Sequence, residues 1–96
     1  MKYTKSTLQK IENIFNELEY TVRYEKGNFN SGYCIVEDRK IAIINRFFNT
    51  EGRINCLIDI LSSIVVIDQN LTEVSRHVYR QILKSIQQNS EIETLV

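Results

Sequence analysis

Residues 22–45, which read VRYEKGNFNSGYCIVEDRKIAIIN, constrain the fold more than any other stretch of the chain. They hold two of the three glycines inside a basic and aromatic segment that lies between apolar, strand-like runs. Glycine and asparagine mark turns because they tolerate positive φ angles, whereas alternating apolar and polar residues have the period of a half-buried strand. The stretch therefore predicts strands joined by a loop over residues 26–32.

We expect three antiparallel strands in a meander. Residues 20–25 alternate between apolar and polar side chains, and residues 33–37 and 40–46 are rich in β-branched residues. The short polar link at residues 38–39 suits a hairpin between the last two strands. The third run, IAIIN, is apolar on both faces of the pleat, so we expect it to be central or covered on both sides.

Helical periodicity predicts three helices around these strands. Apolar residues recur three and four positions apart over residues 7–19, from Ile54 to Val65, and over residues 72–88. The predicted fold class is α+β, with the order α-β-β-β-α-α and helices on one face of the sheet. We expect one domain over residues 1–96, with a frayed end at 89–96.

Capping residues locate the starts of the first two helices. Ser6 and Gln9 have the spacing of a capping box, in which each side chain satisfies a backbone N–H near the start of the helix. Asn49 or Thr50 is placed to cap the second helix, and Glu51 lies favourably against its dipole.

The second predicted helix carries apolar residues on two sides. Cys56, Ile60 and Ile67 lie opposite the stripe that runs from Ile54 to Val65. One side can pack on the sheet, but the other needs either the third helix or a second copy of the chain. Because a short chain exposes little contiguous apolar surface, we expect a homodimer. The β-branched run at residues 64–67 admits a fourth strand as an alternative to helix.

Composition and charge narrow the class of protein. The chain has 96 residues, 43% of them apolar and 25% charged, which is typical of one globular domain. Twelve basic residues balance twelve acidic ones, so no net charge attracts nucleic acid or an anionic membrane. The amino-terminal residues lack the apolar core of a signal peptide, and no stretch approaches the length that spans a bilayer. We therefore expect a cytoplasmic protein without a membrane partner.

The loop and its flanking strands form the candidate binding site. They combine cations, aromatic rings and amides, a mixture that suits anions, stacked bases or a partner's peptide. The alternative is that the aromatic residues pack over the sheet. A nucleic-acid partner is less expected, because residues 20–53 hold only six basic side chains against four acidic ones. The predicted binding residues are Arg23, Tyr24, Lys26, Asn28, Phe29 and Tyr33.

The second predicted helix offers no catalytic or metal-binding set. Asn55 and Asp59 are spaced i, i+4 on a helix that follows a strand, an arrangement that resembles the zincin metallopeptidases and their H-E-x-x-H motif. Both histidine positions hold other residues, Cys56 stands in place of the glutamate, and no third ligand is evident. The resemblance, over about residues 31–63, implies at most a degenerate domain of that kind. We expect Cys34 and Cys56 to be reduced core residues, because their spacing matches no zinc site.

The string YEKGNFNSGYCIVEDRKIAIIN, followed by FFNTEGRINCLIDIL, resembles a group of small bacterial proteins that share the pattern Y-x-K-G-x-F-x-S-G-Y-C and have no assigned activity. The resemblance implies a bacterial cytoplasmic protein of the same fold and transfers no activity. We therefore predict a small non-enzymatic binding or protein-interaction module, without catalytic residues, metal or cofactor. The alternatives are the degenerate metallopeptidase-like domain and a small single-stranded nucleic-acid binder.

Overall fold

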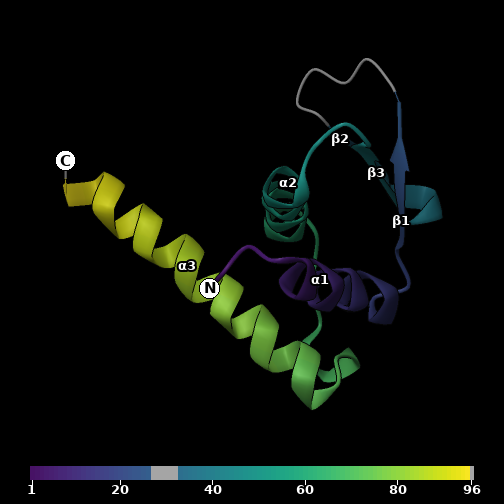
Figure 1. The fold of residues 1–96 in the computed structure, drawn as a ribbon. Coiled ribbons are helices and arrows are strands. Elements are labelled where there is room, and N and C mark those ends of the chain that lie inside the picture. Colours follow the sequence, from purple (N-terminus) through teal and green to yellow (C-terminus); the bar gives the residue numbers. More distant parts are fainter. Residues whose placement is uncertain (27–32, 96) are drawn as a thin grey trace.

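The computed structural model describes the backbone of residues 1–26 and 33–95 and the side chains of residues 1–26 and 33–86. Three helices and three strands follow the predicted order α-β-β-β-α-α (Figure 1). Two short 3₁₀ turns, η1 and η2, lie between them. The elements are α1 (Lys5–Glu17), β1 (Thr21–Glu25), β2 (Tyr33–Val36), η1 (Glu37–Arg39), β3 (Ile41–Asn45), α2 (Thr50–Ser63), η2 (Asp68–Asn70) and α3 (Glu73–Leu95).

The sheet is mixed, so the prediction of an antiparallel meander was wrong. The strand order is β1-β3-β2, in which β1 pairs with β3 in parallel and β2 pairs with β3 antiparallel. The second and third strands do form the expected hairpin, through η1 and Lys40. A meander would place β2 in the middle, but β3 is the strand with apolar residues on both faces. The central position is the one that covers such a strand best.

Side chains alternate across the sheet as the sequence predicts. Val22 and Tyr24 of β1 pack against the core, while Ala42 and Ile44 of β3 are fully buried. All three α-helices lie on the inner side of the sheet, where α1 and α2 contact the strands and α3 packs against α1 (Figure 1). The outer face carries Arg23 and Glu25 at one edge and half-buried apolar side chains elsewhere, namely those of Cys34, Val36, Ile41 and Ile43.

α1 lies between the other two helices and contacts both of them. Its buried stripe forms the centre of a core to which β3, α2 and α3 also contribute. Cys56 and Ile60, on the second apolar side of α2, are buried within the same chain. That side of α2 therefore needs no second copy to cover it, and the argument for a homodimer has to rest on another surface.

The structure confirms the predicted cap of α2 but not that of α1. Asn49 caps α2, since its side chain accepts a hydrogen bond from the backbone N–H of Gly52 at 2.9 Å. The cap of α1 is Thr4, which accepts from the N–H of Thr7 at 3.3 Å. The predicted capping box at Ser6 was therefore wrong, because Ser6 already lies inside α1.

The helix ends differ from prediction at α2 and α3. α2 ends at Ser63, where the hydroxyls of Ser62 and Ser63 donate to backbone carbonyls one turn earlier, at 2.6 and 2.8 Å, and where a run of β-branched residues follows. Residues 64–67, hereafter the extended segment, are therefore neither helix nor part of the described sheet. α3 continues to Leu95, beyond the predicted end at Gln88. Within the described residues, no helix is both long enough and apolar enough to cross a membrane.

Candidate functional site

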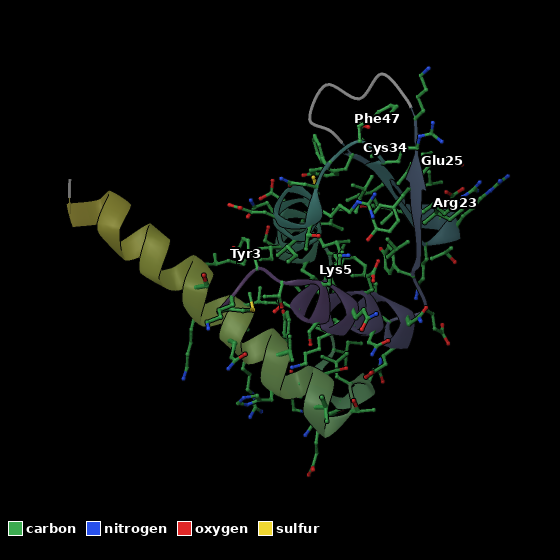
Figure 2. The ribbon with its side chains drawn as sticks, in the orientation of Figure 1. Tyr3, Lys5, Arg23, Glu25, Cys34 and Phe47 are labelled. Carbon is green, nitrogen blue, oxygen red and sulfur yellow. The ribbon has the colours of Figure 1, made fainter. Side chains whose placement is uncertain are left out.

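The structure separates the predicted binding residues onto different surfaces. Arg23 is exposed on the outer face, where its guanidinium forms a 2.6 Å ion pair with Glu25 (Figure 2). Lys26 is also exposed. Tyr24 and Tyr33 face the helices and pack against the core. The remaining two predicted residues, Asn28 and Phe29, lie outside the described part of the chain, and a binding role for the set stays a prediction.

Tyr24 is committed to contacts within the protein. Its hydroxyl donates a 2.5 Å hydrogen bond to the Glu12 carboxylate, and the Arg53 guanidinium lies 4.3 Å from the centre of its ring. Burial, followed by the hydrogen bond and the negative charge of Glu12, raises the pKa of Tyr24 well above its ordinary value. One face of the ring is thus occupied by Arg53, which leaves it poorly placed to stack on a nucleic-acid base.

Arg53 also holds the connection between β3 and α2. Its Nε donates to the carbonyl of Phe48 at 3.0 Å, and its Nη2 donates to the carbonyl of Arg46 at 2.9 Å. One guanidinium therefore links α2, the strand-to-helix connection and Tyr24 on β1. We refer to Glu12, Tyr24 and Arg53 as the clamp; it closes the end of the sheet at which β1 and β3 finish.

The positions that correspond to the zincin motif lie beside the clamp. Asn55 and Asp59 are exposed on α2, whereas Cys56 is buried. Burial and the neighbouring carboxylate of Asp59 raise the pKa of the Cys56 thiol, which favours the unreactive protonated form. Burial, Asp59 and Cys56 likewise raise the pKa of Tyr33. Among residues 1–26 and 33–86, no three His, Cys, Asp or Glu side chains gather as they would around a metal ion.

A groove of about 640 Å³ lies at the opposite end of the sheet, where β1 and β3 begin. Its walls are irregular segments: the turn between α1 and β1, the turn between β2 and β3, and the connection between α2 and α3. None of the predicted binding residues contributes to it. The lining residues are Glu17, Leu18, Glu19, Tyr20, Glu37, Lys40, Ser63, Ile64, Val65, Ile67 and Asn70.

The extended segment forms one wall of the groove with strand-like alternation. Ile64 and Val66 pack against the core, whereas the side chains of Val65 and Ile67 are 89% and 53% exposed. The backbone is extended at both ends of the segment, with φ and ψ of −105° and 160° at Ile64 and −96° and 109° at Ile67. The segment is therefore extended at both ends and presents two branched apolar side chains to solvent.

The Glu17 carboxylate, which lines the groove, connects α1 to the start of α3. It accepts hydrogen bonds from the Thr72 N–H at 2.7 Å, the Ser75 hydroxyl at 2.5 Å and the Thr72 hydroxyl at 3.2 Å. Burial alone would raise the pKa of Glu17, but the hydrogen bonds from Ser75 and Thr72 outweigh it and lower that pKa. The carboxylate thus stabilises the start of α3, where the helix dipole also favours negative charge.

The other charged residues of the groove are available to a partner. Within the described part of the chain, the side chains of Glu19, Glu37 and Lys40 form no hydrogen bond or ion pair. Glu19 and Lys40 are also the described non-glycine residues with positive φ, at 65° and 52°. Backbone strain of this kind occurs more often near functional sites than elsewhere.

No family model, curated protein or solved structure matches the chain. The site is therefore identified by its geometry alone. Sequence reasoning missed the groove because its residues are far apart along the chain and include no motif. One available signal was the β-branched run at residues 64–67, which is followed by Asp68 and Asn70, residues typical of a turn.

Proposed function

We propose that the protein is a small non-enzymatic interaction module that binds a protein or peptide partner in the groove. The observation that carries this proposal is the pair of exposed apolar side chains, Val65 and Ile67, in a concave surface rimmed by charged residues. Apolar surface surrounded by polar groups is typical of protein interaction sites. The Arg23 and Lys26 surface, predicted from the sequence, remains a second place at which a partner can bind.

Selection from a random peptide display library against the wild-type protein tests this function. Binding of the selected peptides would then be measured with Val65→Asp and Ile67→Asp. The control is Val74→Asp, because Val74 is 68% exposed on α3 and lies outside the groove. We expect the groove variants to lose about tenfold or more in affinity, equivalent to about 1.4 kcal/mol, and the control to keep it. Peptides that bind all three variants equally, or a library that yields no binder, would count against the proposal.

We also retain the homodimer, on a different surface from the one that suggested it. The outer face of the sheet presents Cys34, Val36, Ile41 and Ile43, and no described helix covers this face. Two such faces can pack together about 10 Å apart across a two-fold axis. Sedimentation equilibrium at tens of micromolar checks this proposal: a dimer that Ile43→Asp dissociates supports it, and a monomeric wild type refutes it.

The alternative functions receive less support from the described residues. Tyr24 and Tyr33 face the core, so they offer no open platform for bases. The strand-then-helix order of the zincin resemblance is present in β3 and α2, but Asn55, Cys56 and Asp59 do not form a ligand set. The free thiols of Cys34 and Cys56 agree with the cytoplasmic location that we propose.

A further inference from the structure

The backbone of the extended segment has unused hydrogen-bonding groups. Within the described residues, the N–H groups of Val65, Val66 and Ile67 have no hydrogen-bond acceptor, and the carbonyls of residues 64–66 have no donor. An extended backbone with free donors and acceptors is the template to which another strand adds. The alternation of exposed and packed side chains already matches a half-buried strand.

The charge of the groove indicates which strand would fit. Three carboxylates, those of Glu17, Glu19 and Glu37, line the groove with one ammonium, that of Lys40. Glu17 is occupied by Thr72 and Ser75, whereas Glu19 and Glu37 have no partner among the described side chains. Free carboxylates beside an apolar wall complement lysine or arginine that alternates with apolar residues.

We propose that the groove binds an extended peptide by strand addition to residues 64–67, and that this peptide carries lysine or arginine at alternate positions. Successive N–H groups of an extended chain point to opposite edges, so its backbone would pair with one alternating set of the segment, either Val65 and Ile67 or Val66. Its apolar side chains would cover Val65 and Ile67, while its cations would approach Glu19 and Glu37. This inference rests on the proposed function and specifies the class of partner that the groove accepts.

A second copy of the same segment is a poorer occupant. The sequence IVVI of residues 64–67 has no charge of its own. Pairing two copies across a two-fold axis would bring two sets of groove carboxylates together, and like charges placed against one another disfavour association. A basic extended peptide brings the opposite charge to the same site.

A panel of four synthetic peptides tests the proposal. The probe is acetylated, amidated Lys-Val-Lys-Val-Lys-Val-Lys. The second peptide has glutamate in place of lysine, and the third is the lysine peptide with N-methyl groups on alternate residues, which remove backbone donors. The fourth, with the lysine peptide's composition in an order that breaks the alternation, controls for attraction by charge alone. Affinity is measured by fluorescence polarisation, and the binding position by amide chemical shifts and hydrogen exchange of ¹⁵N-labelled protein.

We expect the lysine peptide to bind and to protect from exchange the amides of one alternating set, either Val65 and Ile67 or Val66. The N-methylated, glutamate and scrambled peptides should each bind about tenfold more weakly or worse. The double variant Glu19→Lys/Glu37→Lys should weaken the lysine peptide by about tenfold. Glu51→Lys, a charge reversal at an exposed site on α2 outside the groove, should alter it by less than about twofold.

Specific results would overturn this inference while leaving the proposed function intact. Equal binding by the N-methylated peptide, or unprotected amides at residues 65–67, would exclude strand addition. Equal binding by the glutamate or scrambled peptide would exclude recognition of alternating cations. The inference would also be overturned if the lysine peptide did not bind while the library-selected peptides bound and lost affinity in Val65→Asp. A dimer in sedimentation that Val65→Asp dissociates would make the second copy the occupant.

Discussion

Charged side chains are used differently at the two ends of the sheet. Where β1 and β3 finish, Arg53 donates to two backbone carbonyls and covers Tyr24, whose hydroxyl is bound by Glu12. Where the same strands begin, Glu19 and Glu37 have no partner among the described side chains, and Val65 and Ile67 are exposed. The clamp therefore uses its polar groups for stability, whereas the groove keeps the carboxylates of Glu19 and Glu37 available.

This difference explains why residue type alone is a poor guide to the site. Arginine, tyrosine and glutamate at the clamp have the character of a recognition surface, but their hydrogen bonds are made within the chain. The groove depends on aliphatic residues and on the carboxylates of Glu19 and Glu37, which have no partner among the described residues. We therefore expect substitutions at the clamp to change mainly stability, and substitutions at Glu19, Glu37, Val65 or Ile67 of the groove to change mainly binding.

The largest effect is expected at the clamp. Arg53→Ala removes two charged hydrogen bonds and the cation–π contact with Tyr24, so the free energy of unfolding should fall by about 2–3 kcal/mol. Arg46→Ala is the control, since the Arg46 guanidinium lies only over the exposed ring of Phe47. That control should cost less than about 0.5 kcal/mol in urea denaturation. Similar losses for the two variants would show that Arg53 does not hold this end of the sheet.

Glu17→Gln should reduce the free energy of unfolding by about 1–2 kcal/mol at pH 7, because it weakens the cap of α3. The folded-state pKa of Glu17 is lowered, so its contribution is complete above the ordinary value of 4.5 and is lost as pH falls through the folded-state pKa. The difference between wild type and variant should therefore shrink below about pH 4.5.

Glu19→Gln, which removes a partnerless carboxylate from the same groove, is the control for this titration. Urea denaturation at several pH values should show almost no difference between this control and the wild type. A loss in Glu17→Gln that does not depend on pH would contradict the role of its charge.

Tyr24→Phe should cost about 1 kcal/mol or somewhat more, because it leaves the Glu12 carboxylate without its hydroxyl donor while keeping the ring beneath Arg53. Tyr3→Phe is a matched control, since no hydrogen bond of the Tyr3 hydroxyl occurs within the described residues. Thermal or urea unfolding distinguishes the pair. Equal stabilities would mean that the short contact with Glu12 contributes nothing measurable.

Lys40→Gly should have the smallest effect on stability, with a gain of up to about 1 kcal/mol. Glycine adopts the left-handed conformation of residue 40 more easily, although its greater freedom in the unfolded chain offsets part of the gain. Lys10→Gly, at an exposed position in the middle of α1, is the opposite control and should lose about 1 kcal/mol. A clear loss in Lys40→Gly would show that the lysine side chain supports the turn.

The number, type and order of the elements could be predicted because periodicity is a local property of the sequence. The two apolar faces of β3 indicated a central or covered strand, but the expected meander placed β2 in the middle instead. The pairing of β1 with β3 could not be predicted, because it depends on the competition between two strands for one central neighbour. The end of α2 was missed because the apolar run continues beyond Ser63, where the helix ends.

The candidate site was less predictable than the fold. The alternation of residues 20–25 is present, with Tyr24 toward the core and Arg23 toward the outer face, yet Tyr24 was predicted as a binding residue. The alternation gave no information about which polar side chains form hydrogen bonds within the chain. Those hydrogen bonds determine whether a polar residue remains available for binding. The groove is lined by the turn before β1, the turn before β3 and the extended segment. These three segments are far apart along the chain, so no local sequence pattern predicts that they lie together.

The most direct test of the contrast between the two ends compares Val65→Asp with Lys26→Glu, using one library-selected peptide. Both side chains are exposed, so neither variant should change stability by more than about 0.5 kcal/mol, which a melting curve verifies first. Isothermal titration should then show a loss of about tenfold or more for Val65→Asp and less than about twofold for Lys26→Glu. A loss confined to Lys26→Glu would place the binding surface at the loop end and contradict the assignment of the groove.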